Sequence, residues 1–111
     1  MRNSVILIGR PGNDPQMKTT NNDKKMASFR LAVAQPRIGA DKQRTYDTQW
    51  FNIKAWGNQA ELVQNLVRKG CKMMIHGMLH NNEWTNADGK RCSSTEILVN
   101  GFSLIDERKA S

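Results

Sequence analysis

Two of the three tryptophans stand in the segment WFNIKAWG, next to polar residues. If residues 50–57 form a strand, their side chains alternate between two faces. One face is apolar and holds Phe51, Ile53 and Ala55. The other face holds Trp50, Asn52, Lys54 and Trp56. Flat aromatic rings stack planar bases, and a neighbouring lysine neutralises phosphate, so this second face indicates non-covalent binding of unpaired nucleic acid.

Trp84 supports the same interpretation, because it lies in a basic hairpin that the turn at residues 88–91 closes. Tryptophan is also usually well buried and is enriched at protein interfaces. The alternative that Trp50 and Trp56 cover a barrel end or a subunit interface therefore stays open. The residues that we expect to contact nucleic acid besides the tryptophans are Lys54, Arg37, Lys42, Arg44, Arg30, Lys72, Lys90 and Arg91.

The charge of the chain favours a polyanionic partner. Its 17 Lys and Arg outnumber its ten Asp and Glu, which gives a formal net charge of +7. Such a balance favours nucleic acid over an acidic protein or a bare membrane. The basic residues fall singly and in pairs at expected loops, so each one alone is also compatible with solvated surface charge.

The cysteines and histidines do not predict a metal site. Cys71 and Cys92 allow at most one disulfide, and a reduced compartment is the simpler interpretation. With His76 and His80 they form the pattern C-x4-H-x3-H-x11-C. In a strand over residues 71–80, however, Cys71 and His76 would point to opposite faces, which a tetrahedral zinc site does not allow.

The sequence also argues against an enzyme. Its acidic residues are scattered, and it has no paired-acid motif, no glycine-rich phosphate loop and no nucleophile elbow. We therefore expect neither catalysis nor a cofactor.

The elements that would position these residues are mostly strands of a single domain of 111 residues. No apolar run approaches the roughly 20 residues of a membrane-spanning helix, and the short N-terminal apolar run indicates a strand rather than a secretion signal. Strands are predicted over residues 4–10, 26–35 and 50–56, with a turn at 12–15. Residues 36–47 predict a long loop or an extended hairpin tip.

One helix is predicted after the strand over residues 50–56. Asn58 is its predicted N-cap, Arg68 and Lys69 its last turn, and Gly70 its end. Alternation then resumes from Cys71, a turn follows Trp84 at residues 86–89, and residues 96–105 supply the last strands, with a break at Gly101.

This order predicts an all-β fold, a five-stranded Greek-key OB-fold barrel with one α-helix between the third and fourth strands. Short, twisted strands must protect their edges, and barrel closure does so. A sandwich would usually need more strands. We expect residues 1–105 to form this domain and residues 106–111 a short C-terminal extension.

Five segments resemble the bacterial-type single-stranded DNA-binding protein family in order and spacing, from about Asn3 to Phe102. They are NSVILIGRPGNDPQ, ASFRLAVA, TQWFNIKAWGNQAELVQNLVRKG, IHGMLHNNEWTNADGKR and TEILVN. The resemblance implies an OB fold, usually a homotetramer, that wraps single-stranded DNA in replication, recombination and repair without catalysis. It also implies that Trp50, Trp56 and Trp84 stack bases and that residues 4–9 form the edge that pairs between subunits, although a dimer stays open.

The sequence departs from the family pattern at two places. Arg37 stands where many members carry another aromatic residue, so a phosphate or cation–π contact is expected there. Members typically continue into a disordered linker and an acidic tip, whereas this sequence stops at DERKAS. Recruitment of other proteins through such a tip is not expected, and truncation and a tail-less member both stay open.

The expected partners are thus single-stranded DNA and further copies of the chain, with no membrane and no cofactor. The expected location is the bacterial cytoplasm, in association with the nucleoid, although an organelle, plasmid or phage origin stays open. The remaining alternatives for function are an OB-fold replication-restart accessory protein, an RNA-binding module and a module that binds only proteins.

Overall fold

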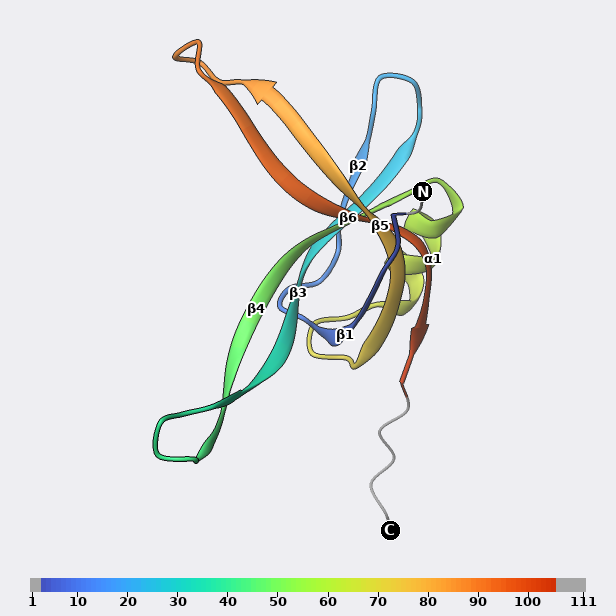
Figure 1. The fold of residues 1–111 in the computed structure, drawn as a ribbon. Coiled ribbons are helices and arrows are strands. Elements are labelled where there is room, and N and C mark those ends of the chain that lie inside the picture. The colour runs from blue at the N-terminus through green and yellow to red at the C-terminus, as the bar shows by residue number, and fades with distance from the viewer. Residues whose placement is uncertain (1–2, 106–111) are drawn as a thin grey trace.

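All strands within residues 3–105 join one sheet that curves into a barrel (Figure 1). The computed structural model describes residues 3–105. The strand order is β1-β5-β6-β4-β3-β2, and a further pairing between β1 and β3 closes the barrel. The elements are β1 (Val5–Pro11), β2 (Gln16–Thr19), β3 (Lys25–Ile38), β4 (Arg44–Trp56), α1 (Asn58–Leu66), β5 (Met73–Thr85) and β6 (Arg91–Leu104).

The five long strands β1, β3, β4, β5 and β6 form the predicted barrel. Its closing contact is short, since only Arg10 and Pro11 of β1 pair with β3. β4 and β6 run parallel, and the other pairings are antiparallel. The helix lies between β4 and β5, which are the third and fourth strands of the barrel, so the OB-fold prediction is confirmed. The sequence did not predict β2, a four-residue strand that pairs with β3.

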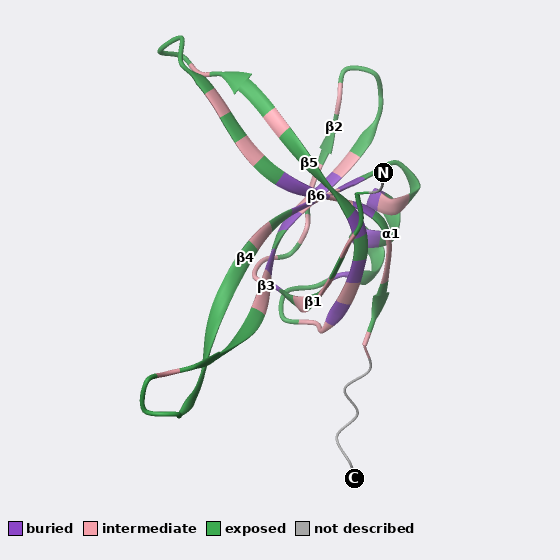
Figure 2. Ribbon diagram, viewed as in Figure 1, coloured by how far each residue is buried: buried purple, intermediate pink, exposed green. Residues whose placement is uncertain are grey.

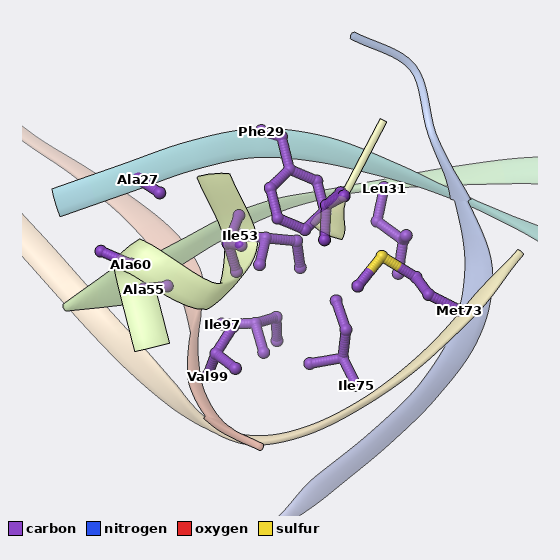
Figure 3. Packing of buried hydrophobic residues seen from close by; sticks show 12 residues of the cluster. Ala27, Phe29, Leu31, Ile53, Ala55, Ala60, Met73, Ile75, Ile97 and Val99 are labelled. Atoms are coloured by element: carbon purple, nitrogen blue, oxygen red, sulfur yellow. The ribbon is translucent and has the colours of Figure 1, made fainter. Parts of the chain in front are cut away.

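The core lies inside the barrel, where twelve apolar side chains converge (Figure 3). β3 and β4 contribute alternate residues to it, and Ala60 and Val63 of α1 are also fully buried. Ile53 and Ala55 are buried and Phe51 is half-buried, so the apolar face that the alternation predicts is confirmed. The buried core residues are Ala27, Phe29, Leu31, Ile53, Ala55, Ala60, Val63, Val67, Met73, Ile75, Ile97 and Val99.

The predicted ends of the helix are wrong. Gly57, with φ 60°, is the N-cap in place of Asn58, and no side chain caps this end. The Gly57 N–H donates to the carbonyl of Lys25, 2.9 Å away, so a contact with β3 determines where the helix starts. Leu66 is the last helical residue, because the next residue, Val67, is extended and fully buried in the core.

The charged end of the helix also differs from the prediction. Arg68 lies beyond the helix, yet its guanidinium donates to the carbonyls of Gln64 and Val67, both at 2.7 Å. Gly70 does not end the helix. It has φ 85°, and its N–H donates to the carbonyl of Pro11 at 2.9 Å.

Two long hairpins project from the barrel, β3–β4 and β5–β6, and their outer parts are largely exposed (Figure 2). The β3–β4 ladder reaches the pair Ile38 and Arg44, so residues 36–47 form the extended hairpin rather than the loop. The predicted turn at residues 86–89 is confirmed, with Gly89 at φ 78°.

β6 starts at Arg91 rather than at Glu96 and runs through Gly101 as one continuous strand. Its register against β5 does shift beside Gly101, because His76 pairs with Gly101 and Gly77 with Val99, so the predicted break is a β-bulge at Asn100 and not the end of a strand. β5 starts at Met73, so Cys71 precedes the strand in which we predicted it. Within residues 3–105, no group of three or more His, Cys, Asp or Glu could hold a metal ion. That same range contains no helix long and apolar enough to cross a membrane.

Candidate nucleic-acid interface

The outer face of β3 and β4 carries two exposed tryptophans. Trp50 is 47% exposed and Trp56 is 40% exposed, whereas Ile53 on the inner face is 1% exposed. Trp50 pairs with Ala32 and Trp56 with Met26 in an unbroken register. The indoles therefore lie on the outside of the barrel, as the alternation predicts.

The ring of Trp50 is held by two neighbours. The Arg30 guanidinium lies over it, 4.7 Å from the ring centroid, in a cation–π contact. Gly12 lies so close that a Cβ atom there would be 2.5 Å from Cζ3 of the indole. The Gly12 N–H donates to the Arg30 carbonyl at 2.8 Å, which connects the two neighbours. Trp50 is thus positioned by the fold, with Gly12 as the contact that sequence reasoning missed.

An open groove of about 560 Å³ adjoins Trp50. Its wall combines the indole with amide, hydroxyl and charged side chains, which suits a planar polar ring better than a purely apolar ligand. The groove is lined by Gly12, Asn13, Gln16, Ser28, Phe29, Arg30, Trp50, Asn52, Ile53, Lys54 and Glu96.

Lys54 contacts a buried carboxylate at the base of this groove. Its Nζ atom lies 2.5 Å from Oε2 of Glu96, which is only 5% exposed. Nδ1 of His80 lies 3.6 Å from the other oxygen, Oε1. A buried charge is costly unless a partner compensates it, so Lys54 compensates Glu96 in the free protein. Sequence reasoning missed Glu96, because no local pattern reveals that its strand lies beside Lys54.

Trp84 lies on the continuation of the same outer face. It is 46% exposed and pairs with Cys92, and the ladder runs without further irregularity to the pair His80 and Glu96. Glu96 in turn pairs with Asn52, between Trp50 and Lys54 on β4. Since directly paired residues point to the same side of a sheet, the three tryptophans share one continuous surface.

A second hollow lies beside Trp56. It is lined by Thr20, Asn22, Lys24, Trp56 and Gly57, which come from the β2–β3 turn, the end of β4 and the N-cap of α1. Lys24 is a basic residue at this hollow that was not among the predicted site residues. The β2–β3 turn, with Lys24, thus extends the outer face that carries Trp50 and Trp56 toward β2.

Five of the predicted basic residues belong to the two hairpins and form two groups. Lys42, Arg44 and Lys90 are exposed at or near the hairpin turns. Arg37 and Arg91 each form an exposed ion pair, with Asp47 and Glu83, both at 3.2 Å. Such exposed pairs contribute about 0–1 kcal/mol, so these arginines can exchange their partner for a phosphate at low cost.

Lys72 lies apart from the groove, immediately before β5, and does not line it. Its backbone carbonyl accepts a hydrogen bond from Ile105 at 2.9 Å, near the end of β6. Arg37 lies on the opposite hairpin face from Trp50, because it pairs with Thr45 in the alternate set of β3–β4 pairs. The contact of Arg37 with a phosphate or a base stays a prediction, and the cation–π contact within the protein is the one between Arg30 and Trp50.

These features define an OB-fold protein with an aromatic and basic groove on its outer face. Its residues 2–105 match the model of the single-strand binding protein family, and the chain belongs to that family. The family supports the expectation of a protein that is not an enzyme.

Related proteins agree with this assignment. The chain is 35% identical over 108 residues to the single-stranded DNA-binding protein of Bacillus cereus, covering 97% of this chain and 62% of that one. It is 30% identical over 106 residues to that of Xylella fastidiosa, covering 96% and 65%. The chain thus spans about three fifths of the length of these relatives.

Two solved structures have the same fold. The Plasmodium falciparum SSB in complex with ssDNA superposes with a TM-score of 0.85 at 27% identity, covering 96% of this chain and 97% of that one. A deletion mutant of the Thermus aquaticus single-stranded DNA-binding protein gives a TM-score of 0.84 at 22% identity, covering 96% and 52%.

Proposed function

We propose that this chain binds single-stranded DNA without reading its sequence. The observation that carries the proposal is the continuous outer face with three half-exposed tryptophans, each near basic side chains. Stacking on an aromatic ring contributes about 1–3 kcal/mol per base and does not depend on base identity, because every base has a π-face. The relatives named single-stranded DNA-binding proteins, and the P. falciparum SSB solved with ssDNA, support the same ligand.

In this mechanism, the chain acts only by binding and protecting unpaired strands. Bases stack on Trp50, Trp56 and Trp84, and phosphates contact the basic hairpins through Lys42, Arg44, Lys90 and Arg91. Arg30 already covers one face of Trp50, so a base stacks on its free face or displaces the guanidinium. A protein of this kind serves replication, recombination and repair, in the bacterial cytoplasm.

We also propose that the chain assembles as a homo-oligomer, most simply a homotetramer, through β1. Residues 5–9 pair with β5 on one side, whereas β1 pairs with β3 only at Arg10 and Pro11. The second edge of residues 5–9 is therefore unpaired within the described range. Ile6 and Ile8 of this strand are 64% and 49% exposed. An unpaired edge beside exposed apolar side chains favours pairing with another copy.

The test of DNA binding is a titration with oligo(dT), followed by intrinsic tryptophan fluorescence. We expect quenching that saturates, because stacked bases quench indoles. Oligo(rU) of the same length separates a DNA-binding protein from an RNA-binding module. Unchanged fluorescence and no binding to either oligomer at physiological salt would instead indicate a module that binds only proteins. Light scattering of the same samples gives the number of chains in the assembly.

A further inference from the structure

The face of β4 that carries Trp50 and Trp56 continues beyond the barrel into the β3–β4 hairpin. The ladder runs without a register shift from the pair of Met26 and Trp56 to the pair of Ile38 and Arg44. Tyr46 pairs with Pro36 in this ladder and lies an even number of residues from Trp50. Tyr46 therefore lies on the same face as Trp50, although sequence reasoning did not single it out.

The environment of Tyr46 gives its ring no structural role. The side chain is 68% exposed, more than any of the three tryptophans. Ile38, on the same hairpin face, is 71% exposed, so this end of the hairpin has no apolar core to maintain. In the part of the chain that the structure describes, the tyrosine hydroxyl makes no hydrogen bond.

An exposed arginine lies two residues before Tyr46 on the same strand. Arg44 is exposed, shares the face of Tyr46 and forms no ion pair within residues 3–105. Arg37 occupies the other face and is paired with Asp47. The face that carries the tyrosine is therefore also the face with the uncompensated arginine, which is the combination that binds a base and its phosphate.

We propose that Tyr46 is a fourth stacking position, which takes an unpaired base of single-stranded DNA while Arg44 contacts the adjoining phosphate. The inference rests on the proposed function and extends it to a site outside the barrel. Tyr46 lies four residue steps from Trp50 along β4. At about 3.3 Å per step, the track of stacking rings lengthens by roughly 13 Å.

Three variants test this position: Tyr46→Ala, Tyr46→Phe and, on the opposite face, Thr45→Ala. Each is titrated with oligo(dT), and tryptophan fluorescence gives Kd. Tyr46→Ala should raise Kd about 5- to 150-fold, the equivalent of losing one stacked base. Tyr46→Phe keeps the ring and Thr45→Ala lies away from the track, so both should stay within about twofold of the wild type.

A direct test uses the fact that the chain has one tyrosine. Labelling with 3-fluorotyrosine gives a single ¹⁹F resonance, which a stacked base should shift upfield when oligo(dT) is added. An unchanged resonance, together with a wild-type Kd for Tyr46→Ala, would overturn the proposal while quenching of the tryptophans still supports DNA binding. No quenching in the wild type would overturn the proposed function itself.

Contact with a second copy of the chain is the competing role for an exposed tyrosine. Light scattering of wild type and Tyr46→Ala without DNA distinguishes it. The stacking proposal expects the same molar mass for both. A smaller assembly for Tyr46→Ala would place the ring in an interface between copies and overturn the proposal.

Discussion

Gly12→Ala should displace Trp50 from its place in the groove. The new Cβ would lie 2.5 Å from Cζ3 and 2.8 Å from Cη2 of the indole, whereas ordinary contact begins at 3.4 Å. The ring must therefore move by about 1 Å or rotate away. Gly12 is not among the glycines with positive φ, so its backbone accepts alanine and the effect comes from the steric contact alone.

The expected cost falls on binding more than on folding. Moving the half-exposed indole disturbs the contact with Arg30, which contributes about 0.5–1 kcal/mol to stability at an exposed site. A misplaced ring also loses its stacked base, which weakens oligo(dT) binding by about 1–3 kcal/mol. Fluorescence titration gives the affinity, and urea denaturation gives the free energy of unfolding.

Two further variants make this prediction sharper. Gly101→Ala is the matched control, because a Cβ there meets nothing within 4 Å, and it should leave Kd unchanged. Trp50→Phe has a smaller ring, so Gly12→Ala should cost less affinity in that background than in the wild type. If Gly12→Ala binds oligo(dT) as the wild type does, the contact between Gly12 and Trp50 does not position the ring and the reasoning is refuted.

Three other perturbations separate the roles of the remaining residues. Trp56→Ala should weaken oligo(dT) binding by about 1–3 kcal/mol with little change in Tm. Ile53→Ala should instead lower the free energy of unfolding by about 2–5 kcal/mol and leave the affinity of the folded protein intact. The reverse pattern would show that the indole of Trp56 is structural. Arg44→Ala should reduce the slope of log affinity against log salt by about 0.7, and titrations at several salt concentrations would expose an unchanged slope. Lys54→Ala should lower the free energy of unfolding by about 3 kcal/mol, because it leaves the buried carboxylate of Glu96 with only a partial partner. Urea denaturation measures this loss, and a neutral result would mean that Glu96 does not depend on Lys54.

Alternation along the chain was enough to separate the inner and outer faces of β3 and of the barrel part of β4. Alternation is a property of neighbouring residues, so the apolar set with Ile53 and the exposed set with Trp50 could be separated without a structure. The order of strands and the one helix was sufficient for the OB fold, since few closed arrangements satisfy it. For residues 36–47, the sequence pattern left two alternatives open, a long loop and an extended hairpin tip.

The contacts between distant segments became visible only in the folded chain. Glu96 contacts Lys54 because β4 and β6 lie side by side, and Gly12 reaches Trp50 because β1 closes against β3. The start of the helix follows a hydrogen bond from Gly57 to β3, so the local N-cap signal at Asn58 was overruled. Such contacts depend on register and closure between strands far apart in the chain, and a local sequence pattern carries no information about either.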